Sequence, residues 1–309
     1  MEHRVNLSLA PNSDRYLGLV FEARPRRHRH EMVPPQRRAP QLGRVTEDVP
    51  GDIVPGDVAQ FLRLALAKAG LDDRLYRITP LIRRLPACLR ALGVGSLEGA
   101  QQLLQAEPSR WSAAIDALLI GTTSFFRDRP VFDTLARLLP GLHEGRGGLR
   151  VWSIGCSDGA ELYSVALLLA ELNVLAQSHF RGTDCRPAAI ERARTGRFHV
   201  GALATTPPDL RRKYFQVEWD HLVLSEDVRR RAEWDTADAL RCQDPGAWDL
   251  ILCRNLAIYI DPGSVRRLWA GLSASLRAGG ILIVGKAERP ATHPPLQRIA
   301  PCIYVKERG

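Results

Sequence analysis

The chain has 309 residues, enough to bury a large core and to form about two domains. It is 45% hydrophobic and 25% charged, as soluble globular proteins are, and no apolar run is long enough to cross a bilayer. The N-terminus lacks the apolar core of a secretory signal, and the six cysteines form no CxxC pair and no cluster with histidines. We therefore expect a cytoplasmic protein with reduced thiols, no bound metal and no membrane insertion.

The formal net charge is +9, and arginine supplies nearly all of the positive charge. A basic surface favours acidic partners, although a generally solvated basic surface explains the charge equally well. The sequence contains no interleaved aromatic platform of the kind that binds nucleic acid, which argues against nucleic acid as a partner.

Residues 1–54 combine many arginines with prolines, so we expect a disordered basic arm. Over residues 55–120 the apolar residues recur at helical spacing, beginning with Phe61, Leu62, Ala65 and Leu66 before a stop at Gly70. This spacing predicts a small all-α domain, with further helices at Thr79–Leu92, Ser96–Gln105 and Ser109–Leu119. Residues 121–148 should form a linker and a helix.

From residue 149 to residue 309 strands alternate with helices. The expected strands are Leu149–Ile154, His179–Thr183, Asp249–Cys253, Ile281–Val284 and Cys302–Lys306, and the expected helices are Glu161–Leu172, Pro187–Arg194 and Pro262–Leu276. This alternation predicts an α/β fold, a Rossmann-like and mainly parallel sheet with helices on both faces. Two runs, Gln216–Val223 and Val228–Trp234, are expected to form a short inserted β hairpin at about 214–235.

The first strand of this domain ends in a small-residue turn that begins at Gly155 and leads directly into a helix. Such a turn lets the backbone approach a ligand closely. Asp184 ends the second strand, 29 residues later, where a carboxylate can bind both hydroxyls of a ribose. A capping role before the Pro187 helix is the alternative for Asp184. The turn lacks the full G-x-G-x-x-G pattern, which disfavours a nucleotide-dependent dehydrogenase.

Three more segments should reach the same edge, because ligands of open α/β sheets lie beyond the carboxyl ends of the strands. Asp238-Ala239 precede the third strand, Arg254-Asn255 end it, and Tyr259 follows a few residues later. Taken singly, Arg254 could be a surface arginine and Tyr259 a core aromatic. Their convergence favours a shared ligand site.

Several strings in order carry a resemblance to a known family: GTTSFFRD from Gly121, VWSIGCSDGAELYS from Val151, GTD from Gly182 and DLILCRNLAIYID from Asp249. Together with LRAGGILIVGKAE and the closing IYVK, they resemble the chemotaxis receptor methyltransferases, the CheR family, over roughly residues 58–306. The T-S-F-F-R and C-R-N-x-x-I-Y-I-D strings are quite specific, whereas the glycine turn is not. The resemblance implies a class I methyltransferase sheet and S-adenosylmethionine as methyl donor, with S-adenosylhomocysteine as product.

The resemblance also implies roles for individual residues. Arg127 would lie near the methyl group, Glu161 would hold the methionine amino group, and Tyr259 would orient the acceptor. The remaining implied cofactor contacts are Thr123, Gly155, Asp184, Asp238, Ala239, Arg254 and Asn255. The chain departs from the family pattern at Gly121, Ala160 and Asp238, where Asn, Glu and Asn are usual, and its hairpin is short.

The implied activity is transfer of a methyl group to glutamate carboxylates of a chemoreceptor-like protein with an acidic helical surface. Arg83, Arg84 and Arg90 on one predicted helix would steer its docking, although a solvated helix face is equally consistent. Two other functions stay open. The first is a methyltransferase of the same fold that acts on another carboxylate or protein. The second is a non-catalytic signalling module that binds the cofactor.

Overall fold

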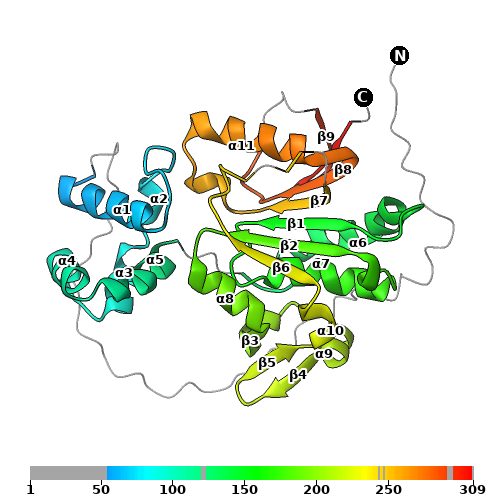
Figure 1. The fold of residues 1–309 in the computed structure, drawn as a ribbon, viewed down its shortest axis with the longest axis horizontal. Coiled ribbons are helices and arrows are strands. Elements are labelled where there is room, and N and C mark those ends of the chain that lie inside the picture. Colours follow the sequence, from blue (N-terminus) through cyan, green and yellow to red (C-terminus); the bar gives the residue numbers. More distant parts are fainter. Residues whose placement is uncertain (1–53, 120–122, 243, 246–247, 291–294, 308–309) are drawn as a thin grey trace, which may run out of the picture.

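A helical part and an α/β part lie side by side in the protein (Figure 1). The structure, a computed structural model, describes residues 54–119, 123–242, 244–245, 248–290 and 295–307. The predicted basic arm, apart from residue 54, and Gly121 lie outside these residues. Among the described helices, none is long and apolar enough to span a membrane.

The helical part consists of α1 (Gly56–Lys68), α2 (Thr79–Ile82), α3 (Leu85–Leu92), α4 (Leu97–Ala106) and α5 (Trp111–Leu118). In α1 the predicted residues Phe61, Leu62, Ala65 and Leu66 are all buried. The helix ends at Lys68, just before the predicted stop at Gly70, whose φ of 75° is unfavourable for other residues. There the Gly70 and Leu71 N–H groups each donate across 3.0 Å to carbonyls of the last turn, which closes the helix.

The predicted helix Thr79–Leu92 is two helices, α2 and α3, that meet near Arg84. Pro86 is the second residue of α3. A proline has no N–H to donate and its ring clashes with the preceding turn, so it kinks or breaks a helix, and here the chain forms two separate helices. Apolar periodicity alone did not reveal the break.

The main sheet of the α/β part has seven strands in the order β6-β2-β1-β7-β8-β10-β9. These are β1 (Arg150–Ile154), β2 (His179–Asp184), β6 (Ala232–Thr236), β7 (Trp248–Cys253), β8 (Leu276–Val284), β9 (Leu296–Ala300) and β10 (Ile303–Lys306). The first five strands in this order pair in parallel, and β10 and β9 add an antiparallel edge. The predicted Rossmann-like fold class is confirmed.

The helices of this part cover the sheet and its small insertion. They are α6 (Arg129–His143), α7 (Ala160–Glu171), α8 (Pro187–Thr195), α9 (Pro208–Tyr214), α10 (Glu226–Arg229) and α11 (Pro262–Ser275). Helix α7 packs on β1 and β2, α8 on β2 and β6, and α11 on β8. Among the described residues, short 3-10 turns lie at Pro108–Arg110 in the helical part and at Leu175–Gln177, Val200–Leu203 and Ala257–Tyr259 in the α/β part.

The strand order reverses at β1. From β1 the chain continues through β2 to β6 on one side, then crosses back to β7 on the other. The connections that follow β1 and β7 therefore leave the sheet in opposite directions and open a crevice at the carboxyl ends of the strands, which is where doubly wound folds bind ligands.

The inserted hairpin is smaller than predicted and has a third strand. It consists of β4 (Phe215–Glu218) and β5 (His221–Leu224), and β3 (Arg197–His199) pairs with β5. The second predicted run does not join it, because β6 pairs in parallel with β2. Trp234 on β6 lies against Gly182 and Gly159, so this strand covers residues beside the glycine turn.

Packing at Trp234 gives the first prediction. A Cβ on Gly182 would lie 2.2 Å from the Trp234 indole, so Gly182→Ala should lower the free energy of unfolding by about 1–3 kcal/mol. In a Trp234→Leu background the same change should cost much less, as urea unfolding of the full chain would show. Gly95→Ala is the matched control because no atom lies near its Cβ position, and it should change stability by under about 0.5 kcal/mol. An equal cost of Gly182→Ala in both backgrounds would contradict this packing.

Candidate functional site

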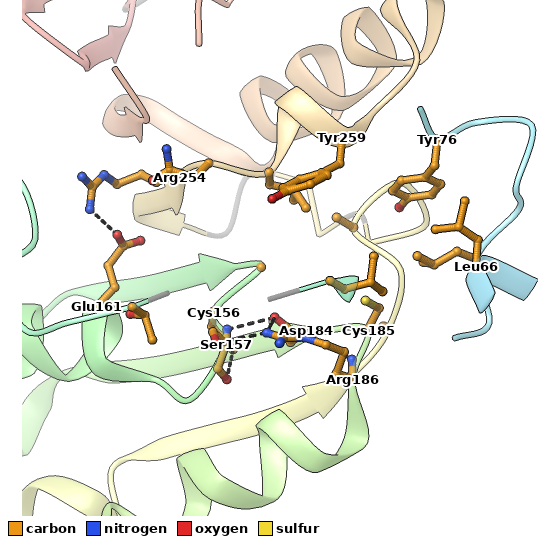
Figure 2. Close-up of a pocket in the computed structure, with 18 of the residues that line it drawn as sticks. Leu66, Tyr76, Cys156, Ser157, Glu161, Asp184, Cys185, Arg186, Arg254 and Tyr259 are labelled. Atoms are coloured by element: carbon orange, nitrogen blue, oxygen red, sulfur yellow. Dashed lines mark hydrogen bonds and ion pairs between the residues drawn. The ribbon is translucent and has the colours of Figure 1, made fainter. Parts of the chain in front are cut away.

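A pocket opens at the carboxyl ends of β1, β2 and β7, where the helical part meets the sheet (Figure 2). It brings together segments that are far apart in the sequence. The predicted site residues that line it are Thr123, Arg127, Gly155, Glu161, Asp184, Ala239, Arg254, Asn255 and Tyr259. Asp238 is the predicted residue that does not line the pocket, and its neighbours Ala237 and Ala239 do.

The helical part supplies a wall of the pocket that the sequence analysis missed. Leu66, Leu71, Tyr76 and Leu81 line it from this side. The segment around Tyr76 pairs as a short antiparallel bridge with Ile260. The Arg77 N–H donates to the Tyr259 carbonyl, and the Asp261 N–H donates to the Leu75 carbonyl, each across 2.8 Å. The loop that carries Tyr259 is therefore fixed by the helical part.

The glycine turn after β1 is held in a conformation that exposes its backbone to the pocket. Gly155 has a φ of 67°, and a Cβ there would lie 3.4 Å from the Leu256 side chain. The N–H groups of Gly155 and Cys156 both donate to the Thr183 carbonyl, which ties the turn to β2. Burial raises the pKa of the Asp158 carboxyl in this turn to about 6.

Asp184 lies at the end of β2 as predicted, with its side chain 6% exposed, and it does not cap α8. Its Oδ1 accepts hydrogen bonds from the Arg186 backbone N–H (3.0 Å) and Nε (2.9 Å). Its Oδ2 accepts from the Ser157 N–H (2.9 Å) and from Arg186 Nη2 (3.3 Å). The carboxylate thus has four donors, two of them from one guanidinium.

Asp238 is buried beside the pocket and contacts the helical part. The Tyr76 hydroxyl and the Leu240 N–H both donate to its Oδ1. Burial and this hydrogen bond raise the pKa of Tyr76 well above its ordinary value. The other carboxylate oxygen, Oδ2, is buried, lies 3.9 Å from Arg241 Nε and has no hydrogen-bond partner among the described residues. It can still accept a donor such as an exocyclic amine.

Arg254 does not stand as a single cation at the end of β7. Its side chain is 1% exposed and pairs with Glu161 of α7 (Figure 2). It also pairs with Asp128 across 2.5 Å. Lys286 also reaches Asp128 across 2.5 Å. Burial by itself would raise the pKa of Asp128, but Lys286 and Arg254 outweigh it and hold this pKa below its usual range.

The linker string T-S-F-F-R-D is anchored by its two phenylalanines. Phe125 packs edge-on against Phe198 and Phe215 of the small sheet. The Phe126 N–H donates to Ser164 Oγ across 2.9 Å. Arg127 lies between these anchors and the Arg254 network, and it lines the pocket.

Glu288 fixes the loop after β7 and was missed as a site residue, although it lies within the GKAE string. It is 3% exposed, and its carboxylate accepts the N–H groups of Asn255 (2.9 Å), Ala257 (2.7 Å) and Gly285 (2.6 Å). These three bonds join the end of β8 to the segment between Asn255 and Tyr259.

Removal of this carboxylate gives a second prediction. Glu288→Ala leaves three buried N–H groups without an acceptor, so it should lower the free energy of unfolding by at least about 3 kcal/mol in urea. Glu191→Ala, on the exposed face of α8, should cost under about 0.5 kcal/mol. Similar losses in the two variants would show that Glu288 does not fix this loop.

The family model described as "CheR methyltransferase, SAM binding domain" matches residues 121–302, which is more than half of the chain. The match covers the linker string, the glycine turn, Asp184 and the Arg254–Tyr259 segment. The chain belongs to the CheR methyltransferase family. The predicted resemblance, the assignment as a methyltransferase and the methyl donor S-adenosylmethionine are thereby confirmed.

Curated relatives agree with this family. A "Chemotaxis protein methyltransferase" of Listeria innocua is 28% identical over 75% of this chain and 90% of its own length. A "Probable chemotaxis protein methyltransferase" of Rhizobium etli is 32% identical over 72% of this chain and 88% of its own length. A "Probable biofilm formation methyltransferase WspC" of Pseudomonas aeruginosa is 30% identical, with 74% of this chain and 56% of that protein covered.

The chemistry of the pocket fits this methyl donor. The close-approach turn at Gly155 suits a nucleoside, and the carboxylate of Glu161 suits a cationic amine. Beside the pocket, Asp238 Oδ2 accepts no hydrogen bond within the described residues and suits an amino group. At Asp184 the Arg186 side chain would have to move before a ribose could bind, because its Nε and Nη2 atoms already donate to the two carboxylate oxygens. In the described part of the chain, no three His, Cys, Asp or Glu side chains are grouped to hold a metal ion.

Proposed function

We propose that this CheR-family enzyme methylates glutamate side chains of a chemoreceptor-like protein with an acidic helical surface. The observation that carries the proposal is the convergence of Arg127, Glu161 and Tyr259 on one pocket between the helical part and the sheet. Two of these groups suit an acceptor carboxylate, and the third suits the amino group of the methyl donor. The relatives named as chemotaxis methyltransferases support the substrate class.

The cofactor-binding roles follow from position. Asp184 would bind the ribose, Ala237 to Ala239 would flank the adenine, and Asp238 Oδ2 would accept from its amino group. Glu161 would hold the methionine amino group while Arg254 keeps that carboxylate in place. Thr123, Gly155 and Asn255 would complete the contacts from the linker, the glycine turn and the end of β7.

S-adenosylmethionine supplies an electrophilic methyl group on a sulfonium. A glutamate carboxylate, with a pKa of about 4.3, is ionised at neutral pH and attacks without a general base. Transfer would join its oxygen to the methyl carbon and break the carbon–sulfur bond, so no proton would have to move. What remains for the enzyme is alignment, which can lower a barrier by about 7–11 kcal/mol. Arg127 and Tyr259 would provide it by holding the acceptor in line.

Docking of an acidic helix would use the arginines of the α2–α3 region. Arg83 and Arg90 are exposed, Arg84 is half-buried, and all three lie on or between α2 and α3, whose Leu81 lines the pocket. Surface charges of this kind raise association rates in a salt-dependent way.

The direct test uses methyl-labelled S-adenosylmethionine, the full chain and membranes rich in chemoreceptors from the same organism. Mild alkali releases methanol from carboxyl methyl esters and leaves N-methyl groups intact. Alkali-labile label in a receptor-sized band is the expected result. Binding of the cofactor without such label would assign a different acceptor. The absence of binding would make the chain a non-catalytic signalling module.

Arg127→Ala should lower the rate of transfer at least about 100-fold while changing the Kd of S-adenosylhomocysteine less than about threefold, because alignment of the acceptor is lost and most cofactor contacts remain. Arg137→Ala, an exposed arginine of α6, is the matched control and should leave both quantities unchanged. An Arg127→Ala enzyme with unaltered transfer would remove this residue from the mechanism.

A further inference from the structure

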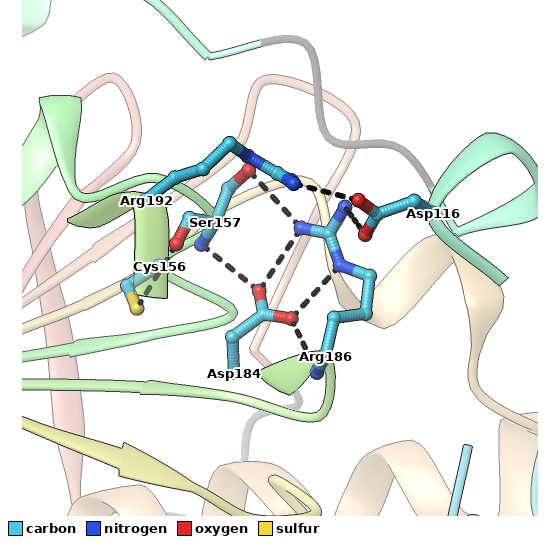
Figure 3. Close-up of polar contacts among 6 residues, drawn as sticks. All are labelled: Asp116, Cys156, Ser157, Asp184, Arg186 and Arg192. Carbon is cyan, nitrogen blue, oxygen red and sulfur yellow. Dashed lines mark hydrogen bonds and ion pairs between the residues drawn. The ribbon is translucent and has the colours of Figure 1, made fainter. Parts of the chain in front are cut away.

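A chain of three ionic side chains links the pocket to the helical part (Figure 3). Asp184 and Arg186 both line the pocket, and Asp116 projects from α5 of the helical part toward Arg186. Arg186 is almost fully enclosed, with its side chain 4% exposed, and neither it nor Asp116 was singled out by the sequence. A buried guanidinium cannot lose its charge, so it always requires a nearby carboxylate.

The acceptor sites of Asp184 are fully used in this arrangement. A carboxylate offers about four lone-pair positions. The backbone N–H groups of Ser157 and Arg186 occupy one position on each oxygen, and the Arg186 Nε and Nη2 atoms occupy the other two. A ribose diol bound to Asp184 needs two positions. The two that can be vacated without moving the backbone are those of the guanidinium.

Asp116 offers the displaced guanidinium a second site. The distance from Arg186 Nη1 to Asp116 Oδ1 is 3.8 Å, close enough for attraction and too long for a hydrogen bond. This oxygen is buried and has no hydrogen-bond partner among the described residues, whereas Asp116 Oδ2 is bonded by Arg192 across 2.7 Å. A shift of the Arg186 side chain toward α5 would satisfy the orphaned oxygen.

We propose that Arg186 is a positioning residue that passes from Asp184 to Asp116 when the ribose hydroxyls of the methyl donor bind. The inference rests on the proposed role of Asp184 as the ribose ligand. The exchange has a consequence beyond affinity. Each bound cofactor strengthens the existing contact between Arg186 and Asp116 of α5, so cofactor binding tightens the helical part, with its docking arginines, against the pocket.

The test is a double-mutant cycle on the Kd of S-adenosylhomocysteine, measured by calorimetry with the full chain. Asp116→Asn should weaken binding about tenfold, because the displaced guanidinium loses a charged acceptor. In an Arg186→Met background the same change should have no effect, and Arg186→Met alone should bind at least as tightly as the wild type. Asp73→Asn, which removes another arginine-paired acid of the helical part, is the control and should not alter the Kd.

A second ligand separates the exchange from a general structural effect. The 2′,3′-dideoxy analogue of S-adenosylhomocysteine cannot displace Arg186, so its Kd should be insensitive to Asp116→Asn. Asp116→Asn removes one oxygen of a side chain that is 23% exposed, and a thermal melt would show that the variant is folded. An equal effect of this change on both ligands, or in both backgrounds, would overturn the exchange.

The outcomes also separate this inference from the proposed function. Wild-type binding with no effect of Asp116→Asn would refute the exchange and leave the methyl-donor site intact. If the wild type fails to bind S-adenosylhomocysteine at all, the proposed function fails, and the exchange fails with it.

Discussion

The guanidinium of Arg254 lies at the end of β7 with its side chain 1% exposed, and it joins three segments that are distant in the sequence. Glu161 brings the start of α7 to it, and Asp128 brings the linker that carries Arg127. Separation of these segments would leave the buried charge of Arg254 unpaired, which would destabilise the fold by about 3–5 kcal/mol. The position of Arg127 relative to the glycine turn, and hence the alignment attributed to it, depends on this buried cation.

A second constraint acts on the opposite side of the pocket. Tyr259 follows the segment that donates backbone N–H groups to Glu288, and its loop is paired with residues 75–77 of the helical part. The residues assigned to the methyl donor thus belong mostly to the sheet, whereas the acceptor-facing side is shared between sheet and helical part. The proposed exchange at Arg186 would couple binding of the methyl donor at the sheet to the packing of the helical part.

Elements with a strong local pattern could be predicted from the sequence. Three patterns identified the fold: the apolar stripe of α1, the alternation of buried strands with helices, and the order of the family strings. Nine of the ten predicted site residues line the pocket. Strand β6 overlaps the predicted run Val228–Trp234, but that run was wrongly assigned to the hairpin, because the partner of β6 depends on where Trp234 packs, over glycines of β2 and of the turn. The break at Pro86 was overlooked because the apolar spacing continues through it.

The ionic contacts could not be predicted, because no local pattern encodes which carboxylate an arginine meets. Arg186 looks like any residue before a helix, yet its side chain fills acceptor positions on the predicted ribose ligand. Tyr76 and Asp238 are 162 positions apart and meet only because the helical part folds over the sheet. Such pairings determine the chemistry of the pocket after the fold has formed.

The central claim is that the methyl donor binds at the carboxyl ends of β1, β2 and β7, beneath the helical part. A crystal structure of the full chain with S-adenosylhomocysteine tests it most directly. The account predicts ribose hydroxyls on Asp184, adenine beside Ala237 and Ala239, the amino group on Glu161, and the sulfur facing Arg127 and Tyr259. A nucleoside bound elsewhere, or a sulfur atom turned away from Arg127 and Tyr259, would contradict it.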